Sequence, residues 1–121
     1  MKSILIIEDD EGTSDILAYV IQDLELNAIL RPDVLSLSEI EKLNPDLILM
    51  DHWLRGAKGG DLCWKIKNNP ATRHIPVILI SALLNVAQIA MDSCADAYIE
   101  KPFDLLDIEK LIKKYLESAG H

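Results

Sequence analysis

The sequence has few cysteines, aromatic residues, glycines and prolines. Its 121 residues include two cysteines, one phenylalanine, five glycines and five prolines. Cys63 and Cys94 do not have the spacing of metal ligands, and no pair of histidines accompanies them, so we interpret them as small hydrophobic residues. No repeat, low-complexity tract or linker rich in glycine, serine or proline divides the chain. We therefore expect a single domain over residues 1–121.

Positive charge is also scarce. Twelve Lys and Arg residues face 20 Asp and Glu residues, which gives a formal net charge of -8. This balance disfavours binding to nucleic acids and anionic membranes, because phosphate contacts need Lys and Arg. No apolar run approaches the ~20 residues of a membrane span. The N-terminal MKSILIIEDD reaches its acidic residues too early for a secretory signal, so we expect a cytoplasmic protein.

Short apolar segments alternate with amphipathic ones along the whole chain. The predicted strands are residues 3–7, 27–31, 46–50, 76–80 and 96–100. Apolar residues at helical spacing separate them, and we expect Thr13 or Ser14 to cap the first helix. Parallel strands need crossover connections, so the alternation predicts an α/β, doubly wound fold with a five-stranded parallel sheet.

Polar side chains follow four of the five predicted strands, at the point where each strand ends. They are Glu8, Asp9, Asp51, Ser81 and Lys101. In a doubly wound sheet the functional crevice lies at the carboxyl ends of the strands, so these groups should meet there. Carboxylates that converge repel each other, and Mg²⁺ prefers such oxygen ligands. A carboxylate, Mg²⁺, a lysine and a hydroxyl suit attack on a phosphorus atom, because the last three neutralise the transferred group.

With these residues in these places, the sequence resembles the receiver domain of two-component response regulators over essentially its whole length. The resemblance rests on ILIIEDDE, PDLILMDHWLRGAKGG, IPVILISA and DAYIEKPF, in this order, with Ser81 thirty residues after Asp51 and Lys101 twenty after Ser81. It implies a flavodoxin-like (βα)5 fold with strand order 2-1-3-4-5. It also implies a phosphoacceptor that receives a phosphoryl group from a histidine kinase or phosphotransfer protein in a Mg²⁺-dependent reaction.

The resemblance assigns a role to each site residue. Asp51 matches the phosphoacceptor, Ser81 the hydroxyl residue that follows the phosphoryl group, and Lys101 the lysine that pairs with it. The bond between Lys101 and Pro102 is typically cis in the family. Four further positions match the metal site and the switch. Glu8 and Asp9 match the acidic pair, with Asp9 the direct ligand. Trp53 matches the residue that binds the metal through its backbone carbonyl, and Tyr98 matches the aromatic switch residue.

The resemblance also implies how the domain signals. Phosphorylation would rearrange the face formed by the fourth helix, fifth strand and fifth helix, which would bind a downstream protein or a second copy of the chain. The domain would be no enzyme beyond its own phosphorylation and dephosphorylation, and we expect no DNA-binding output domain in this chain. Two alternatives are a phosphate-independent binding module, which would usually lack one of these residues, and an aspartate-nucleophile phosphatase, which would carry an aspartate where Trp53 stands.

The sequence departs from the family pattern in three respects, of which the third involves a pair of residues. Arg55 stands where proline is frequent, and Lys58 where an acidic residue is frequent. Trp53 and Leu83 occupy the two positions that line the path of the hydrolytic water in the family. Because both side chains are large and apolar, we predict slow self-dephosphorylation. His52 is expected to be a half-buried loop residue rather than a base.

Overall fold

The computed structural model describes residues 1–54 and 56–119, and the prediction for Arg55 lies outside them. The elements in chain order are β1 (Ser3–Ile7), α1 (Glu11–Asp23), β2 (Asn27–Arg31), α2 (Leu37–Leu43), β3 (Leu47–Asp51), β4 (Trp53–Leu54), β5 (Ala57–Lys58), α3 (Gly59–Lys67), β6 (Val77–Ser81), α4 (Val86–Asp92), β7 (Ala97–Glu100) and α5 (Leu105–Ala119). The predicted strands are confirmed to within one residue.

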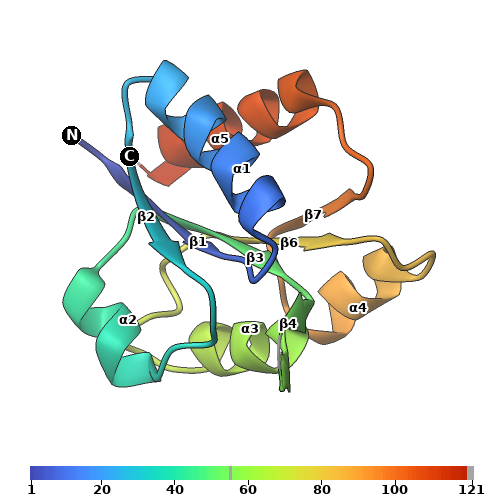
Figure 1. Ribbon diagram of the computed structural model, residues 1–121. Helices are drawn as coiled ribbons and strands as arrows, with labels where there is room; N and C mark the ends of the chain where they lie inside the picture. Colours follow the sequence, from blue (N-terminus) through green and yellow to red (C-terminus); the bar gives the residue numbers. More distant parts are fainter. Residues whose placement is uncertain (55, 120–121) are drawn as a thin grey trace.

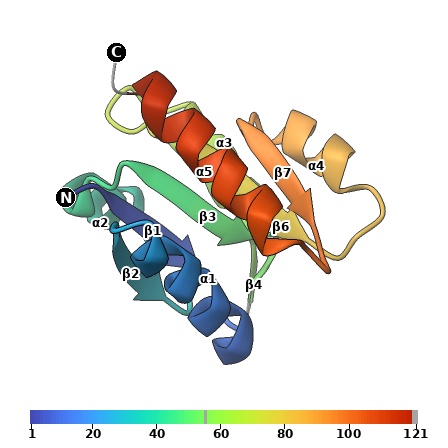
Figure 2. The ribbon, with the colours of Figure 1, turned by 90° about the horizontal axis from the view of Figure 1, so that it is seen from above.

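The main sheet has five parallel strands in the order β2-β1-β3-β6-β7. This is the expected flavodoxin-like order 2-1-3-4-5, because β4 and β5 form a separate small antiparallel pair. Figure 1 shows α1 and α5 on one face of the sheet and α2, α3 and α4 on the other. Seen from above, α1 and α5 run across the same face of the sheet (Figure 2).

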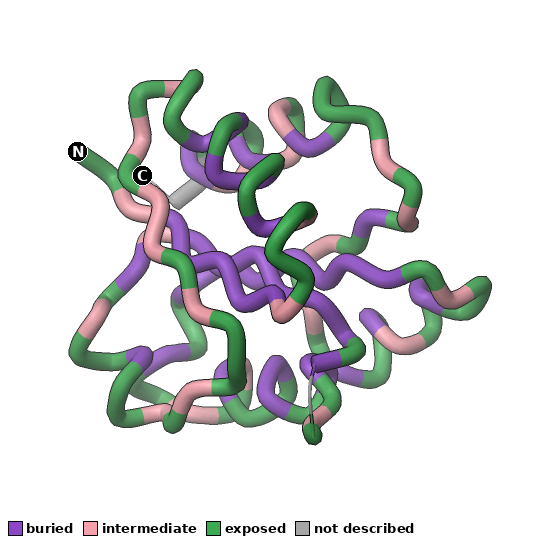
Figure 3. Tube along the Cα trace, viewed as in Figure 1, coloured by how far each residue is buried: buried purple, intermediate pink, exposed green. Residues whose placement is uncertain are grey.

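The two faces of the sheet bury separate apolar clusters, because side chains alternate along a strand. On β3, Leu47 and Leu49 pack toward α1 and α5, whereas Ile48 and Met50 pack toward α2, α3 and α4. All five residues of β3 and of β6 are buried, and the centre of the molecule is accordingly buried in Figure 3. The central strands thus form a rigid support that ends at the rim with the polar residues.

The start of α1 differs from the prediction. Asp10 is the N-cap, and its Oδ2 accepts hydrogen bonds from the Thr13 N–H at 2.9 Å and the Thr13 hydroxyl at 2.6 Å. The prediction that Thr13 or Ser14 caps the helix is therefore wrong. An aspartate caps as well as a serine or threonine, and its charge suits the positive end of the helix. These hydrogen bonds hold the pKa of Asp10 below its ordinary value.

Candidate functional site

The polar rim follows from the alternation of side chains along the strands. Each of the three charged residues comes two positions after an apolar residue that faces α1 and α5. Glu8 follows Ile6, Asp51 follows Leu49, and Lys101 follows Ile99 in this way. Because residues two apart in a strand point to the same side, the three charged groups leave the ends of β1, β3 and β7 in the same direction. They lie far apart in the sequence and meet only in the folded sheet.

Lys101 joins the two buried carboxylates. Its Nζ lies 2.9 Å from Oε1 of Glu8 and 3.0 Å from Oδ2 of Asp51. Glu8 and Asp51 are only 4% and 7% exposed, so these charge-assisted bonds are poorly screened by water. Burial lowers the pKa of Lys101, but its bonds to Glu8 and Asp51 outweigh burial and raise that pKa above its ordinary value. The lysine is thus held charged at the centre of the site.

One lysine does not balance the acidic groups around it. Carboxylate oxygens of Glu8, Asp9 and Asp51 lie within 4.8 Å of one another. Oε2 of Glu8 is buried and, within the described part of the chain, makes no hydrogen bond. Burial and the neighbouring Asp51 carboxylate raise the pKa of Glu8 from 4.5 to about 7, against the lowering effect of Lys101. A hard divalent cation fits this donor set, because it would supply both the missing charge and a partner for the free oxygen.

The Asp51 carboxylate is oriented by the chain that follows it. The backbone N–H of Trp53 donates a hydrogen bond to Asp51 Oδ1 at 3.2 Å. The Trp53 side chain is 50% exposed, and Nζ of Lys58 lies 5.6 Å from the centre of its ring. The β4–β5 pair therefore presents an aromatic ring, with a lysine near it, directly after Asp51. The expected role of the Trp53 carbonyl as a metal ligand stays a prediction.

Ser81 and Tyr98 stand where the sequence places them, but neither contacts Asp51 directly through a hydrogen bond among the described residues. The Ser81 side chain is fully buried, and its hydroxyl accepts a hydrogen bond from the Leu83 N–H at 3.1 Å. Its backbone carbonyl accepts one from the Lys101 N–H at 2.8 Å. Tyr98 is 43% exposed. The peptide bond between Lys101 and Pro102 is cis, as the resemblance implies.

Two features of the site escaped the sequence prediction. His52 is buried rather than half-buried, and its ring makes close contacts with Gly60. Its position after an apolar strand and before two glycines is a weak signal that could have suggested this. The two-residue strands β4 and β5 were also missed, because strands that short leave no periodic pattern.

Comparison with known proteins places the chain in a family. It matches the response regulator receiver domain over residues 4–113. It is 30% identical to the phosphate regulon transcriptional regulatory protein PhoB of Rhizobium meliloti (strain 1021), over 98% of this chain and 54% of that protein. The chain thus spans about half the length of the curated relatives it matches.

Solved structures show the same fold. A CheY-like receiver domain protein of Methanospirillum hungatei JF-1 superposes with a TM-score of 0.88 at 24% identity, covering 99% of this chain and 97% of that one. The receiver domain of the sensor histidine kinase PA1611 of Pseudomonas aeruginosa PAO1, with a magnesium ion coordinated in its active site cleft, gives a TM-score of 0.85 at 21% identity, covering 96% and 98%. With the family match and the fold in agreement, this chain belongs to the response regulator receiver domains of two-component systems.

Proposed function

We propose that this receiver domain accepts a phosphoryl group on Asp51 in a Mg²⁺-dependent reaction. One observation carries the proposal: the Nζ of Lys101 bonds both Glu8 and Asp51, and an oxygen of Asp9 lies close enough to theirs for all three carboxylates to bind one metal ion. The chain retains every charged group that the chemistry needs, at the same edge of the sheet. The phosphodonor is a phosphohistidine of a histidine kinase or a phosphotransfer protein, by similarity to other receiver domains.

Each residue of the site has a separate role in the transfer of the phosphoryl group. A carboxylate oxygen of Asp51 attacks the phosphorus atom, an O–P bond forms, and the bond between phosphorus and the donor atom breaks with its electron pair leaving on the donor. Lys101 neutralises negative charge on the phosphoryl oxygens, and the Ser81 hydroxyl donates a hydrogen bond to one of them. Trp53 holds the carboxylate through its backbone N–H.

Glu8, Asp9 and Asp51 would hold the metal ion, together with the Trp53 carbonyl. When bound, Mg²⁺ supplies positive charge that offsets both the carboxylates and the transferred group. A solved receiver domain of the same fold, that of PA1611, has a magnesium ion in its active site cleft. The domain acts on no other substrate and catalyses only its own phosphorylation and dephosphorylation.

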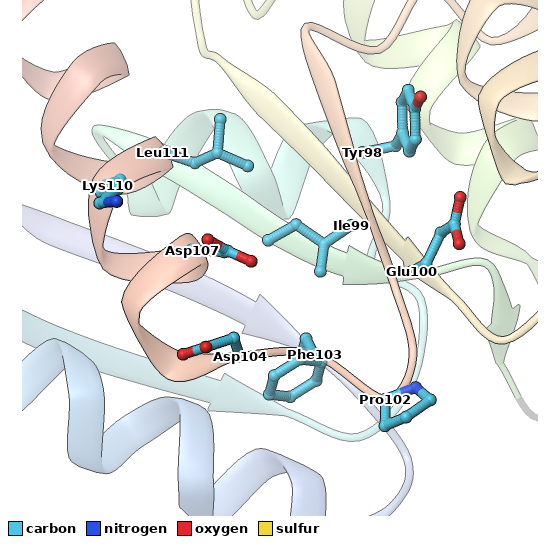
Figure 4. Close-up of a pocket in the computed structure, with 9 residues that line it drawn as sticks. All are labelled: Tyr98, Ile99, Glu100, Pro102, Phe103, Asp104, Asp107, Lys110 and Leu111. Carbon is cyan, nitrogen blue, oxygen red and sulfur yellow. The ribbon is translucent and has the colours of Figure 1, made fainter.

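The output surface is formed by α4, β7 and α5. Two grooves, of about 550 and 460 Å³, lie on this face, and both are lined by Tyr98 and Leu111. Figure 4 shows the larger groove, in which Tyr98, Ile99 and Glu100 come from β7 and Asp107, Lys110 and Leu111 from α5. Tyr98 is half-exposed and lines both grooves, so an inward turn of its side chain would change the shape of both. A downstream protein, or a second copy of the chain in a homodimer, would bind there.

The decisive experiment is phosphorylation by a small donor. The protein is incubated with Mg²⁺ and acetyl phosphate, and intact mass spectrometry records the gain of one phosphoryl group. Asp51→Asn, which keeps the shape of the side chain, should show no gain. Asp23→Asn at the exposed end of α1 is the matched control and should behave as the wild type. No gain in the wild type, or an undiminished gain in Asp51→Asn, would overturn the proposal.

A further inference from the structure

His52 follows the phosphoacceptor and faces the other side of the sheet. It continues the positions of Ile48 and Met50, which pack toward α3 and α4. Its side chain is therefore directed away from the acidic cluster, and the residue is only 7% exposed. A buried histidine needs hydrogen-bond partners, and those of His52 lie on the two elements that support the phosphoacceptor strand.

Three hydrogen bonds fix this residue in place. Its backbone N–H donates to the Ile80 carbonyl at 3.0 Å, and its own carbonyl accepts from the Gly59 N–H at 2.6 Å. The ring nitrogen Nδ1 accepts a hydrogen bond from the Gly60 N–H at 3.1 Å. Because a backbone N–H can only donate, Nδ1 carries no proton. Burial lowers the pKa of His52, in keeping with a neutral ring.

Gly60 leaves the space that the imidazole fills. A Cβ atom at position 60 would lie 2.7 Å from Oγ of Ser93 and 3.0 Å from both Cε1 and Nδ1 of His52. The glycine is thus required for close approach. Ser93, the C-cap of α4, is itself buried. His52, Gly60 and Ser93 therefore form one buried contact unit, with Gly60 between the other two, that joins the end of β3, the first turn of α3 and the end of α4.

This unit also contacts the group that orients Asp51. The imidazole packs edge-on against the Trp53 ring, with ring centres 5.2 Å apart and an angle of 65° between the planes. The Trp53 N–H in turn donates to Asp51 Oδ1. Gly59 lies directly against the Asp51 carbonyl, where any Cβ would collide with it. The acceptor carboxylate is thus held through its own backbone and through Trp53, and His52 supports both.

We propose that His52 is a positioning residue for phosphoryl transfer: by accepting the Gly60 N–H and packing on Trp53, it holds the Asp51 carboxylate in its reactive position. This inference rests on the proposed function of Asp51. The ring makes no contact with the phosphoryl group and moves no proton in the reaction. Its effect comes from geometry, because a displacement of about 1 Å at the reacting group can reduce a rate by about a hundredfold.

The test compares His52→Leu with His52→Asn. Leucine fills similar volume but leaves the Gly60 N–H without an acceptor, whereas the amide oxygen of asparagine can take the place of Nδ1. Phosphorylation rates are measured with acetyl phosphate and saturating Mg²⁺, at a temperature at which every variant is fully folded. We expect His52→Leu to react about ten times more slowly or worse, and His52→Asn to regain most of the wild-type rate.

A matched control separates positioning from lost stability. Thr72→Val removes another buried side-chain hydrogen bond, from the Thr72 hydroxyl to the Ile66 carbonyl at 2.9 Å, at a distance from the strand ends with the site. It should lower the melting temperature without lowering the rate. Should His52→Leu fail to fold, His52→Gln replaces it, because glutamine is polar but places its acceptor one bond too far out.

The outcomes are distinct. A wild-type protein that takes up no phosphoryl group overturns the proposed function and this inference with it. A wild type that is phosphorylated, together with His52→Leu that reacts as fast, overturns only the role of His52. The same holds if His52→Asn is as slow as His52→Leu, or if Thr72→Val slows the reaction equally.

Discussion

At Glu8 the proposed binding of a metal ion conflicts most directly with the stability of the folded protein. The variant Glu8→Gln should make this conflict measurable. Its carboxylate is 4% exposed, one oxygen has no hydrogen-bond partner among the described residues, and its pKa is raised from 4.5 to about 7. Each unit of such a rise in pKa corresponds to about 1.36 kcal/mol, so charging Glu8 in the folded protein destabilises it by up to roughly 3 to 4 kcal/mol. Glutamine keeps the shape and removes the charge.

The sign of the pH dependence follows from the raised pKa. Below pH 4.5 the residue is protonated in both the folded and the unfolded chain, and its contribution to stability is fully present. That contribution is lost as the pH rises toward and through about 7, because the unfolded chain then releases the proton more readily than the folded one. Glu8→Gln should therefore match the wild type near pH 4.5 and be more stable near pH 8.

The assay is urea unfolding of both proteins across this pH range, without metal and then with Mg²⁺. Bound cation stabilises a folded protein by about 1.4 kcal/mol when its concentration is ten times the dissociation constant. The wild type should gain this stability, and Glu8→Gln should gain much less. A variant that is less stable than the wild type at pH 8 without metal would refute the reasoning, as would a difference between the two that does not change with pH.

Three further predictions concern single side chains. Lys101→Met should destabilise the metal-free protein by roughly 2 kcal/mol or more in urea unfolding, since it leaves Glu8 and Asp51 unpaired; equal stability would contradict this. Trp53→Asn should shorten the lifetime of the phosphoryl group, measured by the decay of the phosphorylated mass, while the equally exposed Trp64→Asn should leave it unchanged. Asp96→Ala should lower the unfolding free energy by about 2 kcal/mol, because its Oδ2 accepts from the Val77 N–H at 2.8 Å and Lys67 Nζ at 2.9 Å.

Most of the sheet could be predicted from the sequence because its strands are short, apolar and separated by amphipathic segments. The strand that begins at Leu47 is buried on both sides, so its residues form a continuous apolar run, which is typical of a parallel sheet. The start of α1 was harder, since Asp10, Thr13 and Ser14 can all cap a helix. Only the hydrogen bonds of the folded chain distinguish among them.

The site was predictable to the extent that it depends on strand ends. Alternation along β1, β3 and β7 is enough to direct Glu8, Asp51 and Lys101 to one place. The sequence holds no comparable information on contacts between elements. It does not show that the Ser81 hydroxyl is engaged by the Leu83 N–H, or that His52 packs against Gly60, because both depend on the paths of loops.

The hydrogen bonds of Lys101 suggest how phosphorylation would reach the output surface. In this structure its Nζ bonds Glu8 and Asp51, and its backbone N–H bonds the Ser81 carbonyl. A phosphoryl group on Asp51 would place new anionic oxygens in front of both Lys101 and the Ser81 hydroxyl. To bond one of them, that hydroxyl must turn toward it, which alters its hydrogen bond to Leu83 in the loop before α4.

New bonds from Lys101 to the phosphoryl oxygens would also affect β7, because Lys101 directly follows that strand and Tyr98 lies within it. Ser81 is fully buried and its strand is packed on both faces, so β6 itself has little freedom to move. Movement is therefore expected in the two segments that are less confined, the loop from Ser81 to α4 and the half-exposed ring of Tyr98. Tyr98 lines both grooves of the α4, β7 and α5 face, and the loop leads directly into α4, so we expect the response to phosphorylation at the surface proposed for partner binding.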